Sequence, residues 1–352
     1  MAKSGVGLDI GNFSIKLVEV EAEGGRFKLK NFQVWELYGE GEEFDSEGPG
    51  ANRLGTAVRL AFNAIKLSPK RLKNISTAIS GPAISVKHIK SIPLAPEEMQ
   101  SSLLFEARKH LPLDESEAVI DFQILKGDMQ SQEMDILLVA TTKKVFDAHL
   151  KMLKDIDVEP TVIDAGTLAL VNSYIAVNGP LTGDNALIFI DIGAKYTSIT
   201  FVGQNSMLFT RDLTWAGSNF TDDIKNLMKV EYAEAEAIKK ERGMGALIGE
   251  ASAEATGGIR VARRMAMDNL VDEIRRSLRY YTKETGCRDF EKILLCGGSA
   301  ALPNLNSYLA ARLNMTVERY NPYASFITPP GFDDTLGSQM AVACGLALRG
   351  VQ

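Results

Sequence analysis

Two short segments of the chain carry an aspartate and a glycine in the same arrangement. Asp9 and Gly11 follow one apolar run, Asp191 and Gly193 follow another, and each pair leads into a second run rich in Ile, Val and Thr. An aspartate beside a tight turn can hold hydrated Mg²⁺, and the backbone N–H groups of a glycine turn form a concave anion site. One copy alone is typical of an ordinary β-hairpin. Two copies, one in each half of a 352-residue chain, favour two hairpins that grip a polyphosphate from both sides.

The elements around these hairpins indicate an α/β protein made of two related halves. The hairpins span 7–20 and 188–202, and apolar residues at helical spacing predict a helix over 52–67. Small residues predict a close-packing helix over 164–177, and a strand at 292–296 is followed directly by three small residues. The pattern therefore predicts a duplicated domain around a shared cleft.

The segment 83–156 interrupts the duplicated pattern. It is predicted to contain three strands and two helices, at 85–89, 119–125, 135–141, 96–110 and 143–155. This content indicates a small α+β subdomain inserted into a larger domain. We therefore divide the chain into a first domain over 1–82, the inserted subdomain over 83–156 and a second domain over 157–352.

Composition restricts the function classes. A hydrophobic content of 45% with 24% charged residues is typical of a globular protein, and 352 residues suffice for two or more domains. The net charge of −6, with no basic stripe, argues against a nucleic-acid partner. No run of 18 or more apolar residues predicts direct membrane insertion, and no signal peptide is visible before the first strand. We therefore expect a cytoplasmic protein that reaches a membrane only through a partner.

The order of these features resembles the actin-like ATPase superfamily, which has a duplicated, ribonuclease H-like α/β fold. The segments EARKHLPLDESEAVIDFQIL (106–125) and LLVATTKKVFDAHLKMLKDIDVEPTVID (137–164) most resemble the PilM family of type IV pilus assembly. The inserted subdomain of that family is similar to that of the division protein FtsA. The resemblance implies an actin-like two-domain fold with a small FtsA-type insertion and a C-terminal helix that returns to the first domain.

The resemblance also implies a site for ATP or ADP with Mg²⁺ between the two halves. Asp9 and Asp191 would position the metal ion through its waters. The nucleotide-binding residues that it implies are Gly11, Asn12, Phe13, Ser14 and Lys16 in a first loop, Gly193, Ala194, Lys195 and Thr197 in a second, Gly217 near the sugar-phosphate, Glu236, Lys239 and Lys240 at the ribose and adenine, and Gly297, Gly298 and Ser299 against the purine.

Three of the implied residues have a second interpretation. Lys16 fits a phosphate contact and an exposed strand lysine equally well, and Lys240 also fits the solvated face of a charged helix. Asp164 is implied as a catalytic residue that orients the attacking water, but an aspartate at the start of a helix can equally be an N-cap. Small residues at Ala165, Gly166, Ala169, Ala341 and Gly345 would let two helices cross closely and form a hinge between the domains.

The function that the resemblance implies is an ATP-binding cytoplasmic scaffold of type IV pilus assembly, at most a slow ATPase. Its partner would be the short N-terminal cytoplasmic tail of a PilN-like inner-membrane protein, which would recruit it to the inner face of the membrane. Pilus motor ATPases and a second copy of the chain are further partners to consider. Two alternatives stay open, an FtsA-like filament-forming division protein and a small-molecule kinase. The first lacks a basic amphipathic C-terminal helix here, and the second lacks an aspartate on a substrate loop.

Overall fold

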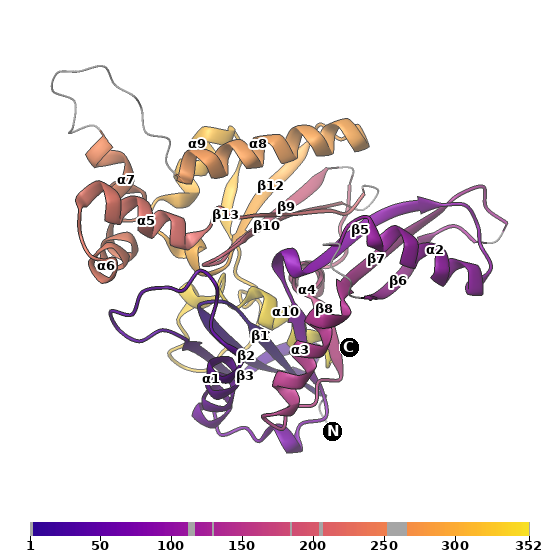
Figure 1. Cartoon of the computed structure of the whole chain (residues 1–352), viewed down its shortest axis with the longest axis horizontal. Coiled ribbons are helices and arrows are strands. Elements are labelled where there is room, and N and C mark those ends of the chain that lie inside the picture. The colour runs from indigo at the N-terminus through magenta and orange to yellow at the C-terminus, as the bar shows by residue number, and fades with distance from the viewer. Residues whose placement is uncertain are drawn as a thin grey trace.

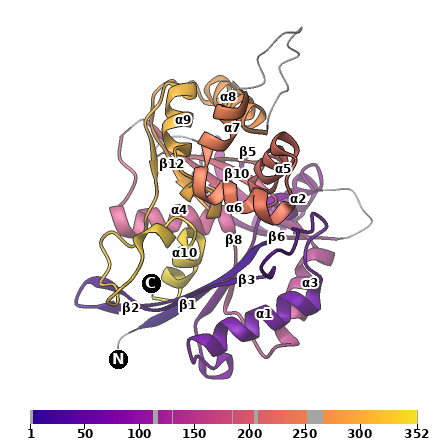
Figure 2. The same ribbon diagram turned by 90° about the vertical axis from the view of Figure 1, so that its left-hand side faces the viewer.

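The chain folds around two five-stranded sheets that have the same topology. Figures 1 and 2 show this computed structural model, which describes residues 3–111, 117–128, 130–183, 185–203, 207–251 and 266–351. The first sheet has the order β3-β2-β1-β4-β8, and the second has the order β11-β10-β9-β12-β13. The strands are β1 (Ser4–Ile10), β2 (Ser14–Glu23), β3 (Arg26–Glu36), β4 (Ile75–Ile79), β8 (Val162–Ala165), β9 (Ala186–Ile192), β10 (Thr197–Val202), β11 (Phe209–Leu213), β12 (Phe290–Cys296) and β13 (Val317–Arg319).

In each sheet the strands pair in the same way. The first three strands along the chain form an antiparallel meander, and the next two join it in parallel. The predicted duplication of an α/β unit is therefore confirmed.

Helices cover the outer side of each sheet. The first sheet carries α1 (Ala51–Ala64) and α3 (Lys143–Lys154); the second carries α5 (Gly217–Met228), α6 (Tyr232–Arg242), α7 (Met244–Ala251), α8 (Ala266–Thr285) and α9 (Leu305–Leu313). Short 3₁₀ turns lie at Pro69–Arg71, Gly81–Ala83, Gly298–Ala301 and Asp334–Leu336. Among the described residues, none of the helices combines the length and apolarity that a bilayer crossing requires.

Two helices lie between the sheets, and one of them contacts the first sheet and the other helix through backbone. These are α4 (Gly166–Asn178) and α10 (Ala341–Arg349), in the centre of Figure 1. A Cβ added at Gly345 of α10 would lie 1.8 Å from the carbonyl oxygen of Ala169 on α4. A Cβ added at Gly7 of β1 would lie 1.9 Å from the carbonyl oxygen of Ala343. The predicted close crossing is confirmed, and α10 does return to the first sheet; the hinge stays a prediction.

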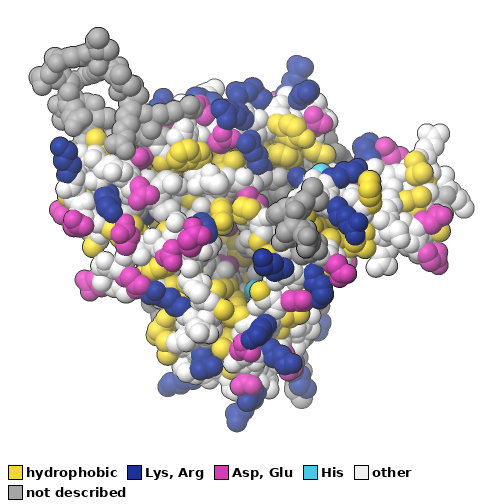
Figure 3. Space-filling view, viewed as in Figure 1, with side chains coloured by type: hydrophobic (Ala, Val, Ile, Leu, Met, Phe, Trp, Pro, Cys, Tyr) yellow, Lys and Arg dark blue, Asp and Glu magenta, His cyan; other side chains and the backbone are white. Residues whose placement is uncertain are grey.

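The inserted subdomain is a three-stranded sheet with one helix. Its strands β5 (Ile84–Ser91), β6 (Ala118–Lys126) and β7 (Met134–Thr142) have the order β5-β7-β6. Helix α2 (Pro96–Arg108) buries Met99 and Leu103 against that sheet. The subdomain projects from the side of the molecule in Figure 1, and Figure 3 shows hydrophobic side chains scattered over its visible face.

The packing places two elements differently from the predicted segment boundaries. Helix α3 lies within 83–156, yet its Met152 and Leu153 pack in the core of the first domain. Strand β8 lies within 157–352, yet it is the last strand of the first sheet. By packing, the subdomain consists of β5, α2, β6 and β7, and α3 belongs to the first domain although it lies within 83–156.

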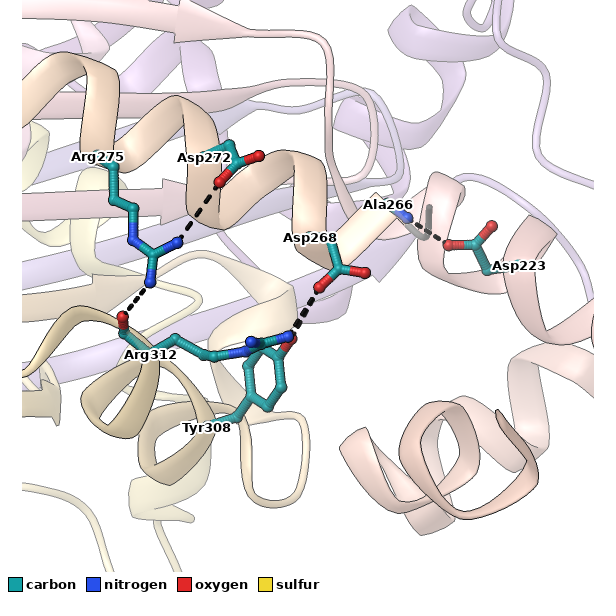
Figure 4. A network of polar contacts seen from close by, with 7 residues as sticks. All are labelled: Asp223, Ala266, Asp268, Asp272, Arg275, Tyr308 and Arg312. Carbon is teal, nitrogen blue, oxygen red and sulfur yellow. Dashed lines mark hydrogen bonds and ion pairs between the residues drawn. The ribbon is translucent and has the colours of Figure 1, made fainter. Parts of the chain in front are cut away.

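A polar network ties three helices of the second domain together, as Figure 4 shows. Arg312 of α9 donates to Asp268 of α8 at 2.9 Å, and Arg275 of α8 donates to the carbonyl oxygen of Arg312 at 2.6 Å. Asp223 of α5 accepts from the N–H of Ala266, where the described part of α8 begins. The network therefore fixes α8 relative to the helices on either side.

The backbone contacts of α10 predict the effect of one added methyl group. Gly345→Ala should lower the free energy of unfolding by about 1–3 kcal/mol, because overpacking forces backbone to move. The control is Gly245→Ala in α7, where an added Cβ meets nothing within 4 Å. Both changes replace a helical glycine, so only Gly345→Ala should destabilise in urea titrations. Equal effects of the two variants would contradict the packing described here.

Candidate functional site

A cleft with a volume of about 290 Å³ lies between the two Asp-x-Gly hairpins. The first domain contributes the turn after β1 to its lining. The second domain contributes the turn after β9, helix α6 and the turn after β12. Of the predicted metal and nucleotide residues, those that line it are Asp9, Gly11, Asn12, Phe13, Ser14, Lys16, Asp191, Gly193, Ala194, Lys195, Gly217, Glu236, Lys239, Lys240, Gly297, Gly298 and Ser299. One cleft therefore brings together residues that are far apart in the sequence.

The two hairpin turns close in the same way. The N–H of Gly11 donates to the carbonyl oxygen of Ser14 at 3.2 Å, and the N–H of Gly193 donates to that of Tyr196 at 3.0 Å. Strand register then places Asp9 opposite Lys16 in the first hairpin and Asp191 opposite Ser198 in the second. Both aspartates and both opposing residues line the cleft. The halves thus present equivalent backbone turns to one space.

The floor of the cleft is acidic and short of positive charge. Lys16 lies 3.2 Å from Asp9, and both side chains are only 13% exposed. Burial, and after it the negative charge of Asp9, raises the pKa of Asp191 to about 6, although Lys16 opposes the shift. Gly297, with φ of 83°, covers Asp191 so closely that an added Cβ would lie 2.4 Å from its Oδ1. Lys16 offsets only part of this negative charge, which fits a hydrated divalent cation.

A buried lysine fixes the turn where α5 begins. Lys239 donates to the carbonyl oxygen of Gly217 at 3.1 Å and to Thr221 Oγ1 at 2.7 Å, and it pairs with Glu236 at 2.6 Å. Burial lowers the pKa of Lys239, while Glu236 raises it. The N–H of Gly217 in turn donates to the carbonyl oxygen of Gly193 at 2.9 Å. Lys239 therefore holds the N-terminus of a 12-residue helix against the second hairpin.

The outer end of the cleft is aromatic. Phe13, Phe44 and Tyr232 all line it, and Phe13 and Phe44 have ring centroids 6.4 Å apart. The ammonium of Lys240 lies 5.9 Å from the ring centroid of Phe13. Lys240 therefore faces the cleft mouth even though its side chain is 57% exposed. This end can pack against a flat ring, whereas the acidic floor cannot.

Two predicted residues lie outside the cleft lining. Asp164 pairs with Arg349 of α10 at 3.0 Å and accepts from the N–H of Ala165 at 2.8 Å. Burial raises the pKa of this carboxyl group, and Arg349 opposes that shift. The N-cap role is not seen, because the residue at the N-cap of α4 is Ala165. The catalytic role of Asp164 stays a prediction. Thr197 is fully buried and donates to the carbonyl oxygen of Trp215 at 2.6 Å, so it supports the second hairpin from behind.

Sequence reasoning missed several residues of the cleft. Ser338 and Gln339 precede α10; Gln339 donates to Ser14 Oγ at 3.4 Å, and Ser338 accepts from the N–H of Gly297 at 2.9 Å. Both domains are thus linked through this segment. Ser80 lines the cleft from the end of β4, and Phe44 lines it from an acidic loop. The Gly-Ser-Gln sequence before a small-residue helix is a sequence signal for Ser338 and Gln339.

The raised pKa of Asp191 predicts a pH effect on the nucleotide-free protein. The folded-state pKa of about 6 lies above the ordinary value of 3.8. The folded state therefore binds more protons than the unfolded state between these values, and stability falls as pH rises through about 6. Asp191→Asn should be more stable than wild type at pH 7.5, by about 2–3 kcal/mol, and nearly equal at pH 4.

Urea titrations across this pH range measure the difference. Asp155→Asn on the exposed end of α3 is the control, and its difference from wild type should not change with pH over this window. The same pH dependence in wild type and Asp191→Asn would mean that Asp191 is not desolvated.

The chain is similar to solved structures over nearly its whole length. A chain of the "PilM-PilN type IV pilus biogenesis complex" is 26% identical, with a TM-score of 0.78, and the match covers 99% of this chain and 98% of that one. Ethanolamine utilization protein EutJ from Carboxydothermus hydrogenoformans is 15% identical, with a TM-score of 0.54 and coverage of 98% and 89%. MreB5 of Spiroplasma citri bound to ADP is 12% identical, with a TM-score of 0.50 and coverage of 98% and 95%. The last two show the shared fold only.

The sequence also matches a family model over almost all of its residues. The model is that of the type IV pilus assembly protein PilM, and it matches residues 7–351. The match takes in both hairpins, the inserted subdomain and α10, so it covers every part of the cleft described above. The fold is the actin-like α/β fold that the sequence resemblance predicted. The chain belongs to the PilM family of type IV pilus assembly proteins.

Proposed function

We propose that this protein is a scaffold of type IV pilus assembly whose two halves are held together by ATP and Mg²⁺. The observation that carries the proposal is the pair of matching turns, Gly11 to Ser14 and Gly193 to Tyr196, on opposite sides of one cleft. A polyphosphate between them would touch both domains at once. Membership of the PilM family supports the pilus role.

The cleft offers chemical groups for each part of such a ligand. Asp9 and Asp191 would hold the cation through water, which supplies the positive charge that Lys16 alone does not. The backbone N–H groups of the two turns would bind phosphate oxygens, since glycine allows their close approach. The N-terminus of α5 at Gly217 adds a further favourable dipole for anions. The turn at Gly297 and Gly298 and the aromatic mouth would take the nucleoside.

We place turnover well below the typical enzymatic range of about 1–1000 per second. The residue implied as the water-orienting group, Asp164, is paired with Arg349 instead. A scaffold needs only the bound state, because ligand that contacts both domains fixes their relative pose. Measured phosphate transfer to a sugar would favour the kinase alternative instead.

We further propose that the partner is a PilN-like inner-membrane protein with a short cytoplasmic tail. The similar chain in the PilM–PilN complex supports a partner of this kind. The tail would lie between the first domain and the inserted subdomain, as an extended peptide that buries apolar side chains. Exposed apolar residues on the subdomain fit such a role; they are Ile92, Phe105, Ile124 and Leu125. The protein would then be cytoplasmic, and recruited to the inner face of the membrane by that tail.

The nucleotide proposal predicts ligand-dependent stabilisation. ATP with Mg²⁺ at a hundred times its dissociation constant should raise the free energy of unfolding by about 2.7 kcal/mol. The double variant Asp9→Asn with Asp191→Asn should lose the Mg²⁺-dependent part of the binding. Isothermal calorimetry with and without Mg²⁺ measures both effects.

The control for this experiment is Asp164→Asn. It removes a buried carboxylate outside the cleft and should leave the dissociation constant for ATP unchanged. If calorimetry and thermal shift detect no ATP binding by the wild-type protein, the nucleotide proposal is wrong.

The partner proposal predicts the result of removing the subdomain. The hydroxyl of Thr141 donates to the carbonyl oxygen of Ala83 at 2.7 Å, so the two ends of the subdomain are adjacent. Residues 84–141 can therefore be replaced by a short Gly-Ser linker that keeps Thr142, whose side chain caps α3. This variant should lose binding to a PilN-like tail peptide and largely keep ATP binding.

Fluorescence anisotropy of the labelled peptide provides the measurement, and a scrambled peptide provides the control. Binding that survives the replacement would contradict the proposed groove. Binding of the wild-type protein to protein-free lipid vesicles would contradict recruitment by a partner.

A further inference from the structure

The acidic loop between β3 and α1 connects the first domain to the second across the mouth of the cleft. We call residues 39–50 the strap; Figure 1 shows it as an indigo loop that reaches toward α6. Lys225 of α5 donates to Glu43 of the strap at 2.7 Å. The backbone of Phe44 also lies close enough to the hydroxyl of Tyr232 on α6 to lower its pKa, against the larger rise that burial causes. The strap therefore touches both helices at the outer end of the cleft.

The base of the strap is held firmly on the first domain. Arg53 of α1 donates to Glu42 Oε1 at 2.6 Å and to the carbonyl oxygen of Leu37 at 2.7 Å. The N–H of Gly39 donates to Glu42 Oε2 at 2.9 Å, and the guanidinium of Arg53 lies 4.9 Å from the ring centroid of Tyr38. These contacts fix where the strap leaves the domain, so its tip reaches the cleft from a defined position.

The tip of the strap places an aromatic ring in the cleft wall. Phe44 lies 5.4 Å from Tyr38 and 6.4 Å from Phe13, measured between ring centroids. Phe44, Phe13 and Tyr232 line the cleft together with the carboxylates of Asp9 and Asp191. A ligand with phosphates on the acidic floor would place its flat base at this aromatic end, because rings stack on rings.

We propose that Phe44 is a nucleotide-contacting residue that the first domain supplies to the base end of the cleft, and that the strap must leave α5 and α6 before nucleotide can leave. This inference rests on the proposed nucleotide function and assigns a residue and a release step to that site. The contacts at its tip are few and partly exposed: the side chains of Glu43 and Lys225 are 59% and 34% exposed. Such pairs are weak and screened by salt, so the strap can open without the domains unfolding.

Release of radiolabelled ATP from the full-length protein tests the role of Phe44. The protein is loaded with ATP and Mg²⁺ and then diluted into excess unlabelled ATP. Phe44→Ala should release the label on the order of ten times faster, since loss of one base–aromatic contact has effects of this size. Phe44→Tyr keeps the ring and should release at close to the wild-type rate. The control is Tyr280→Ala, at a 48% exposed tyrosine on α8 that does not line the cleft, which should leave the release rate unchanged.

Charge reversal tests the contact of the strap with α5. Glu43→Lys should speed release by about two- to fivefold, and adding Lys225→Glu should restore the wild-type rate. Glu40→Lys makes the same charge change in the strap, at a residue with no ion pair among the described residues, and should leave the rate unchanged. Melting temperatures without nucleotide check that each variant is folded.

The outcomes separate the strap from the site itself. If Phe44→Ala and Phe44→Tyr both release ATP at the wild-type rate, the role of Phe44 is overturned while the nucleotide site stands. If Lys225→Glu fails to restore the rate in Glu43→Lys, the contact with α5 does not control release. If the wild-type protein retains no label at all, the nucleotide function fails together with this inference.

Discussion

Contact between backbones, without side chains in between, determines how the two halves of this protein meet. Helix α10 lies directly on β1 at Gly5 and Gly7 and directly on α4 at Gly345. At such distances even a small sideways shift of the helix would cause steric clashes with backbone carbonyl oxygens, so the position of α10 is tightly defined. The segment before α10 then contacts Ser14 in one half and Gly297 in the other. The facing arrangement of the two hairpin turns follows from this central packing.

The two halves share topology but not charge. Strand register places Lys16 opposite Asp9, whereas the equivalent position opposite Asp191 is occupied by Ser198, which donates to Asp212. The first hairpin therefore carries its own counterion, and the second does not. A cation that enters the cleft gains most at the second aspartate, which is also the one covered by Gly297. The duplicated backbone supplies the shape of the site, and the divergence of these side chains makes it asymmetric.

Local features of the site could be predicted from the sequence, and features set by long-range packing could not. The hairpins were predictable because strand, turn and glycine are adjacent in the chain, and the order of elements identified the fold. The pairing of Asp164 with Arg349, far along the chain, could not be predicted, because the face toward which a strand residue points depends on the sheet around it. Helix α3 follows the inserted strands in sequence but packs with α1. Phe44 was missed because it lies in a loop without periodicity, where only the folded chain shows what it touches.

The place of α10 in the chain has a consequence for biosynthesis. Every other described element leaves the ribosome before α10, yet β1, the first strand, packs against it. The first sheet therefore stays without one of its covering helices until residues 341–349 are available. Contacts of such long sequence separation slow folding and leave apolar surface open to aggregation in the meantime. During synthesis the first half of the molecule, which carries the first hairpin of the site, therefore stays incompletely packed until α10 is made.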